Sequence, residues 1–132
     1  MDTLTLPTQR PAELKAALAQ ASRVLGAGGL VAFPTDTVYG LGGRVDDPLA
    51  ISRLYTVKGR EKSKAIPVLV GNPADLELVA VQVGAAALNL ATRFWPGPLT
   101  LVVPRHPALP PELGPQPTIG VRMPDHPVAL AI

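Results

Sequence analysis

Cysteine is absent from this chain of 132 residues, and aromatic side chains are few. Without cysteine there can be no disulfide framework, no thiolate metal site and no cysteine nucleophile. Two Tyr, two Phe and one Trp are too few for the base-stacking surface of single-strand nucleic-acid binders. No run approaches the ~18–20 apolar residues that a membrane helix needs, and no signal-peptide pattern opens the chain. We therefore expect a cytoplasmic protein that makes no use of a membrane.

Two common nucleotide-binding motifs are also missing. No glycine-rich loop ends in Lys-Ser or Lys-Thr, and no dinucleotide fingerprint follows a predicted strand. The charge is only mildly basic, because 12 Lys and Arg oppose 10 Asp and Glu. Hydrophobic residues make up 47% of the chain and charged residues 17%, which predicts a packed core and excludes wholesale disorder. We expect one domain over residues 1–132.

Helices and strands are predicted to alternate along the chain. Pro11 suits a first helical position, apolar residues recur at helical spacing after it, and glycines at 28 and 29 end that helix. A buried strand at 30–33 and a second short strand within 35–43 follow. The other predicted elements are helices at 46–57, 72–79 and 85–94, and strands at 66–70, 99–103 and 118–122. Such alternation predicts an α/β fold with an open mixed sheet flanked by helices.

Asp125 and Pro127 begin a last helix that has neither a glycine cap nor a basic final turn. An apolar, uncapped end of this kind leads us to expect that the domain is incomplete after residue 132.

The segment 33–42 (FPTDTVYGLG) places hydroxyls on both sides of a carboxylate, directly after a predicted strand. Ligands of open α/β sheets gather at the carboxyl ends of strands, and glycines let a backbone approach a ligand closely. Thr35 and Thr37 would point the same way if the chain were extended there. A hairpin-like turn with a hydroxyl cap explains the same pattern, so both interpretations stay open.

The segment 58–64 (KGREKSK) holds four positive charges and one negative charge, just past a predicted helix end. Positive side chains favour the helix dipole there, so a solvated basic loop is one interpretation. The other is a clamp for a triphosphate, in which the lysine and arginine side chains of this segment would balance the charge of departing pyrophosphate.

Arg122 ends an apolar strand, where its charge must meet an anion or reach water. A free carboxylate ligand would suit it, and so would an ion pair with a nearby acid such as Asp125. His126 is expected to be structural, and a metal site is not expected around it. The turn at 95–100 (WPGPLT) is expected to pack on the core without a catalytic role.

These segments, in this order, resemble the YrdC-like family of threonylcarbamoyl-AMP synthases. The resemblance covers about 100 residues and rests on four stretches: 28–42 (GGLVAFPTDTVYGLG), 58–64, 95–100 and 121–127 (VRMPDHP). It implies a twisted mixed α/β sheet with a positively charged concave face. This chain ends before the Ser-Ala-Asn motif that family members carry after the helix near His126.

The resemblance implies an enzyme that condenses L-threonine, bicarbonate and ATP, with Mg²⁺, into threonylcarbamoyl-AMP and pyrophosphate. Partner proteins would then pass the threonylcarbamoyl group to tRNA. Carried over by position, the threonine-binding residues are Thr35, Thr37, Tyr39 and Arg122. The ATP-binding residues are Lys58, Arg60, Lys64 and Thr118, and the first three also serve catalysis.

Two other functions remain open from the sequence. One is a double-stranded RNA- or tRNA-binding module without catalytic activity, which the family resemblance permits but the modest net charge does not favour. The other is a carbamoyl-transfer domain of the hydrogenase-maturation kind, which normally belongs to much longer chains with zinc-binding cysteines.

Overall fold

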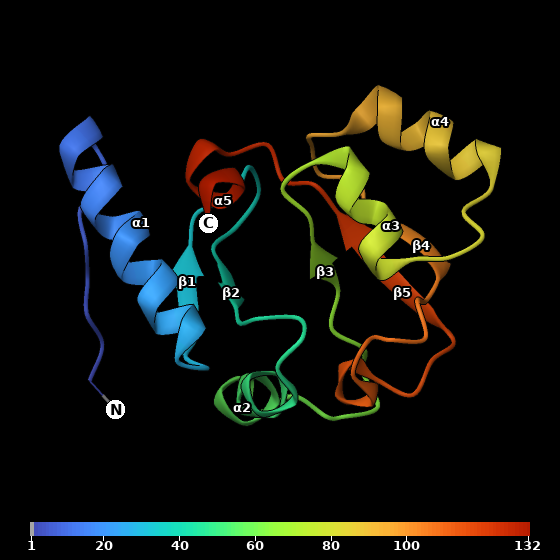
Figure 1. Cartoon of the computed structure of the whole chain (residues 1–132), viewed down its shortest axis with the longest axis horizontal. Coiled ribbons are helices and arrows are strands. Elements are labelled where there is room, and N and C mark those ends of the chain that lie inside the picture. Colours follow the sequence, from blue (N-terminus) through green and yellow to red (C-terminus); the bar gives the residue numbers. More distant parts are fainter. Residues whose placement is uncertain (1) are drawn as a thin grey trace.

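The computed structural model describes residues 2–132, whose helices surround two small β-sheets (Figure 1). Helices and strands alternate through much of the chain, as the sequence predicts for an α/β fold. The helices are α1 (Pro11–Gly26), α2 (Pro48–Lys58), α3 (Leu76–Val79), α4 (Ala85–Phe94) and α5 (Pro127–Ala131), with short 3₁₀ helices η1 (Pro73–Asp75) and η2 (Pro111–Leu113). The strands are β1 (Val31–Phe33), β2 (Gly40–Gly42), β3 (Val68–Leu69), β4 (Leu101–Pro104) and β5 (Thr118–Arg122).

The larger sheet is mixed and open. Its strand order is β3-β5-β4, with β3 parallel and β4 antiparallel to β5. Leu69 lies opposite Arg122 in the parallel pair, so this arginine stands at the end of the central strand. The smaller sheet is the antiparallel pair β1–β2, in which Phe33 lies opposite Gly40. The predicted fold class is confirmed, although the strands divide into two sheets.

The main core lies around the three-stranded sheet. Alternate residues of β5 are buried, and Ile119 and Val121 are almost completely inaccessible to solvent. Tyr55 of α2 and Trp95, which follows α4, are buried in the same cluster. In Figure 1, α3 and α4 lie beside this sheet. The smaller sheet lies next to it, with β2 facing β3 and α1 beside β1. Within residues 2–132, no helix is both long and apolar enough to cross a bilayer.

The helix starts follow the sequence closely. Asp47 caps α2, since its carboxylate accepts hydrogen bonds from the amides of Leu49 at 2.9 Å and Ala50 at 3.2 Å. Asn72 caps η1 in the same way. The cap of α5 is His126, whose Nδ1 accepts from the amide of Val128 at 3.2 Å. His126 is therefore structural in this fold, as expected.

The strands depart from the predicted bounds. The strand expected at 66–70 shrinks to Val68–Leu69, because Pro67 has no amide hydrogen for the ladder. The strand expected at 99–103 is Leu101–Pro104, because the Leu99 carbonyl accepts a hydrogen bond from the Trp95 indole at 2.8 Å. The strand expected to be buried at 30–33 buries only Phe33.

Candidate ligand-binding site

The segment after β1 is a bend that brings two threonine hydroxyls together. The side-chain oxygens of Thr35 and Thr37 lie 3.2 Å apart, and the Thr37 amide donates to the Thr35 hydroxyl at 3.2 Å. The Thr35 hydroxyl in turn donates to the Val38 carbonyl. The bend therefore has the internal hydrogen bonds of a hydroxyl-capped turn. It also presents Thr37, which is exposed, towards the end of β5.

Arg122 reaches from the end of β5 to this bend. Its Nη1 donates to the Thr37 hydroxyl at 3.1 Å, and its Nη2 forms an ion pair with the Asp36 carboxylate. Both charged side chains are largely enclosed, with exposed fractions of 15% for Arg122 and 17% for Asp36. The ion pair with a nearby acid, which the sequence left open, is present, but the acid is Asp36 and not Asp125. Asp125 instead donates its backbone amide to Asp36, at 3.2 Å.

The turn at residues 95–100 holds the same arginine from the other side. Nε of Arg122 donates to the Gly97 carbonyl at 3.0 Å, and the Gly97 amide donates to the Met123 carbonyl at 2.8 Å. Trp95 anchors this turn in the core. The expectation of a structural role for the turn is thus confirmed, and the turn also fixes the direction of Arg122.

A guanidinium group has five N–H donors. Three hydrogen bonds of Arg122 are accounted for by Gly97, Asp36 and Thr37, so two N–H groups remain for a ligand. A carboxylate would suit these donors, because its oxygens form strong hydrogen bonds with guanidinium N–H groups. Tyr39 lies three residues beyond Asp36, but its side chain is exposed and makes no hydrogen bond with any residue of 2–132.

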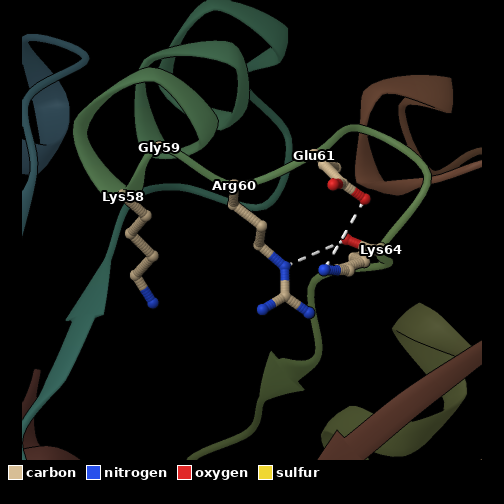
Figure 2. A pocket seen from close by; sticks show the side chains of 5 residues that line it. All are labelled: Lys58, Gly59, Arg60, Glu61 and Lys64. Carbon is tan, nitrogen blue, oxygen red and sulfur yellow. Dashed lines mark hydrogen bonds and ion pairs between the residues drawn. The ribbon is translucent and has the colours of Figure 1, made fainter.

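The basic loop after α2 lines a hollow of about 410 Å³. Figure 2 shows its lining residues, Lys58, Gly59, Arg60, Glu61 and Lys64. Gly59 ends the helix in the left-handed conformation, with φ 55°, which turns the chain sharply between the two neighbouring cations. Lys64 lies 3.6 Å from Glu61, whereas Lys58 has no charged or hydrogen-bonding partner within residues 2–132.

Arg60 shapes this loop as well as charging it. Its Nε donates to the Lys64 carbonyl at 3.1 Å and its Nη2 to the Ala65 carbonyl at 2.9 Å. The buried hydroxyl of Tyr55 lies 3.1 Å from the same Lys64 carbonyl and 3.3 Å from that of Leu113. The loop is therefore held by hydrogen bonds from within the chain.

The predicted site residues fall into two groups. The residues assigned to threonine, apart from Tyr39, meet at the carboxyl end of β5. Thr118 begins β5 at its opposite end, and the basic loop leads into β3 from that same end. Lys64 precedes Leu69, the register partner of Arg122, by five residues, or roughly 16 Å of extended chain. No hydrogen bond or ion pair within residues 2–132 joins the two groups.

Asp36 is a site residue to which the sequence assigned no role. Its place between Thr35 and Thr37 was the available signal, but its partner is 86 positions away. Only the fold brings the two charges together.

A second hollow, of about 530 Å³, lies between the segment after β2 and the outer edge of β3. Its lining is mostly apolar and also includes Arg44 and Asp46. The hydrogen bonds from Arg44 lower the pKa of Asp46 below its usual value. None of the predicted site residues lines this second hollow.

The described residues contain no group of three or more His, Asp or Glu that could hold a metal ion by itself. Glu61 is the carboxylate of the basic loop, and it lies among cations. Mg²⁺ in nucleotide sites is commonly held by one or two carboxylates together with the phosphates of the substrate. Among the residues that line this hollow, Glu61 has the one carboxylate that could join the phosphates in holding such an ion.

The open mixed sheet, the strand-end arginine and the basic loop define an α/β domain with two candidate anion-binding groups of residues. A family model for Sua5, YciO and YrdC proteins, described as "Telomere recombination", matches residues 23–132. The chain belongs to this family.

Curated relatives carry a common name. The threonylcarbamoyl-AMP synthase of Pyrococcus abyssi is 43% identical over 106 residues, covering 80% of this chain and 31% of that protein. The Bacillus subtilis protein of the same name is 41% identical over 117 residues, covering 87% and 34%. A putative synthase of Mycobacterium tuberculosis is 37% identical over 131 residues, covering 98% and 60%. The chain thus spans between about a third and three-fifths of these relatives.

Solved structures show the same fold. Pyrococcus abyssi Sua5 in complex with L-threonine superposes with a TM-score of 0.86 at 40% identity, over 89% of this chain and 35% of that one. YciO of Escherichia coli gives a TM-score of 0.79 at 25% identity, over 89% and 57%.

Proposed function

We propose that this chain provides the substrate-binding core of an L-threonylcarbamoyladenylate synthase. The reaction condenses L-threonine, bicarbonate and ATP to threonylcarbamoyl-AMP and pyrophosphate, for threonylcarbamoyladenosine modification of tRNA by partner proteins. The observation that carries the proposal is Arg122, which is enclosed beside two threonine hydroxyls and retains two N–H donors. A relative of the same fold is known in complex with L-threonine.

In this proposal the threonine end of the site orients the amino acid. Arg122 binds the carboxylate, and Thr35 and Thr37 contact the small polar side chain, with Tyr39 closing the pocket. The ammonium group of threonine releases a proton to solvent, and the resulting amine combines with bicarbonate to a carbamate with loss of water. A carbamate persists only where water is limited.

The basic loop serves the nucleotide. A carbamate oxygen attacks the α-phosphorus of ATP, the bond to the bridging oxygen breaks, and pyrophosphate leaves. Lys58, Arg60 and Lys64 hold the β- and γ-phosphates and stabilise the negative charge on the leaving group, while Thr118 contacts the nucleotide. Mg²⁺ bound to ATP supplies further charge neutralisation. The separation of the two residue groups suits ATP, because its triphosphate can extend from the amino acid towards the loop.

The first test is pyrophosphate release from ATP, with mass detection of the adenylate. Release that requires both threonine and bicarbonate supports the synthase. Binding of both ligands without release would mean that residues 1–132 hold the substrates but need further groups for the chemistry. A chain that binds neither ligand, yet binds double-stranded RNA with steep salt dependence, would instead be an RNA-binding module.

A second test separates the two groups of residues. Arg60→Ala and Lys64→Ala should weaken ATP binding about tenfold each and leave threonine binding nearly unchanged, because each removes a charge-assisted contact to phosphate. Arg122→Ala should do the reverse. Equal effects of all three substitutions on both ligands, measured by calorimetry, would contradict this division of the site.

A further inference from the structure

We infer that Asp36 binds the α-amino group of the substrate, so that Asp36 and Arg122 together recognise an α-amino acid as a zwitterion. This inference rests on the proposed function and adds a residue and a selection rule to it. The sequence predicted that Arg122 binds the carboxylate of the substrate, but it predicted no partner for the amino group.

The ion pair itself provides the first argument. One oxygen of Asp36, Oδ1, accepts from Nη2 of Arg122 and from the Asp125 amide. The other oxygen, Oδ2, has no hydrogen-bond partner in the part of the chain that the structure describes. A carboxylate oxygen can accept more than one hydrogen bond, so Oδ2 is available to an N–H group of a ligand.

Charge balance provides the second argument. Arg122 and Asp36 form a neutral pair with little exposure to solvent, where an uncompensated charge is unfavourable. A simple carboxylic acid bound to Arg122 would place a second anion beside Asp36. An amino acid brings a carboxylate and an ammonium group on one α-carbon, so the four charges alternate and cancel.

Rigidity provides the third argument. Asp36 is fixed by Arg122 and by the backbone of Asp125, while Arg122 is fixed by the Gly97 carbonyl and the Thr37 hydroxyl. The two charged groups therefore keep their relative position in the absence of ligand. A preorganised pair of this kind discriminates between ligands by geometry, with little loss of side-chain entropy on binding.

The test compares three ligands by calorimetry on the full chain: L-threonine, 3-hydroxybutyrate, which lacks the amino group, and L-threonine methyl ester, which lacks the carboxylate. We expect the wild-type chain to bind L-threonine at least about tenfold more tightly than either analogue. Asp36→Asn should weaken threonine binding by about tenfold or more and leave 3-hydroxybutyrate binding unchanged or tighter. The preference for the amino group should thus be lost.

Asp125→Asn is the matched control, because it removes a neighbouring negative charge whose side chain does not contact Arg122. This variant should keep the preference for threonine over 3-hydroxybutyrate. If Asp36→Asn keeps the preference too, and lowers only the melting temperature, then Asp36 is structural and the inference is overturned while the proposed function stands.

The wild-type measurement also stands alone, should Asp36→Asn fail to fold. Wild-type chain that binds 3-hydroxybutyrate as tightly as threonine would overturn the inference without any variant. Wild-type chain that binds neither threonine nor ATP would overturn the proposed function, and the inference with it.

Discussion

Arg122 donates a hydrogen bond to the hydroxyl of Thr37 over 3.1 Å, although 85 positions separate the two residues. Thr37 belongs to the bend between the strands of the small sheet, and Arg122 ends the central strand of the larger one. The contact, with the ion pair to Asp36, therefore joins the two sheets at the site. The proposed ligand would bind where the two halves of the fold meet.

Lys58 and Arg60 should respond differently to loss of charge. Lys58→Gln should weaken ATP binding about tenfold with little change in the melting temperature, because Lys58 has no hydrogen-bonding or charged partner within residues 2–132 and contributes only its charge at the end of α2. Arg60→Gln should lower both the affinity for ATP and the melting temperature, because the Arg60 guanidinium also donates hydrogen bonds to the carbonyls of Lys64 and Ala65. Calorimetry and thermal melting measure the two effects.

Lys62→Gln provides the control for that comparison. Lys62 belongs to the same loop but does not line the hollow. If its substitution weakened ATP binding as much as Lys58→Gln, the loop would act only through its total charge, and the assignment of individual phosphate contacts would be wrong.

Asp47→Ala should destabilise the fold by about 1 kcal/mol, because it removes the cap that accepts two amide hydrogen bonds at the start of α2. Urea unfolding followed by circular dichroism gives this value. Asp46→Ala, next to it, breaks only an exposed ion pair with Arg44 and should have a much smaller effect. Equal destabilisation by the two substitutions would contradict the capping role.

Tyr55→Phe should lower the free energy of unfolding by about 1–2 kcal/mol, because the carbonyls of Lys64 and Leu113 lose the Tyr55 hydroxyl as a donor. The same urea measurement applies. Tyr39→Phe is the matched control. Tyr39 is exposed and has no hydrogen bond within residues 2–132, so this variant should be as stable as the wild-type chain. If Tyr39→Phe destabilised the chain and Tyr55→Phe did not, the role of the Tyr55 hydroxyl in holding the loop would be wrong.

Much of the fold could be predicted from local signals. Pro11, the Asp47–Pro48 pair and Asn72 mark helix starts through chemistry that acts within a few residues, and α4 was predicted with its observed bounds. Strand lengths were harder, because a ladder depends on a neighbour that is remote in sequence. Pro67 was the one local sign that the strand around Val68 would be short.

The candidate site residues could be named by type from the sequence, but their contacts could not. The hydroxyls, the basic loop and Arg122 could be named from composition and order. The choice of Asp36 over Asp125 as the partner of Arg122 could not, because both are acidic and only the tertiary path of the chain brings one of them to Nη2. The structural role of Arg60 was hidden in the same way, since its acceptors are backbone carbonyls that carry no sequence signal.

The turn at residues 95–100 should influence how the affinity for the amino acid changes with temperature. Trp95 fixes the turn in the core, and Gly97 fixes Nε of Arg122. Local openings in proteins occur at free energies below that of global unfolding, so warming that loosens this turn would free the arginine while the sheets remain intact. Affinity for the amino acid should then decline on heating before any loss of secondary structure. Trp95, which contacts no ligand in this proposal, would thereby set the upper temperature at which the amino acid binds.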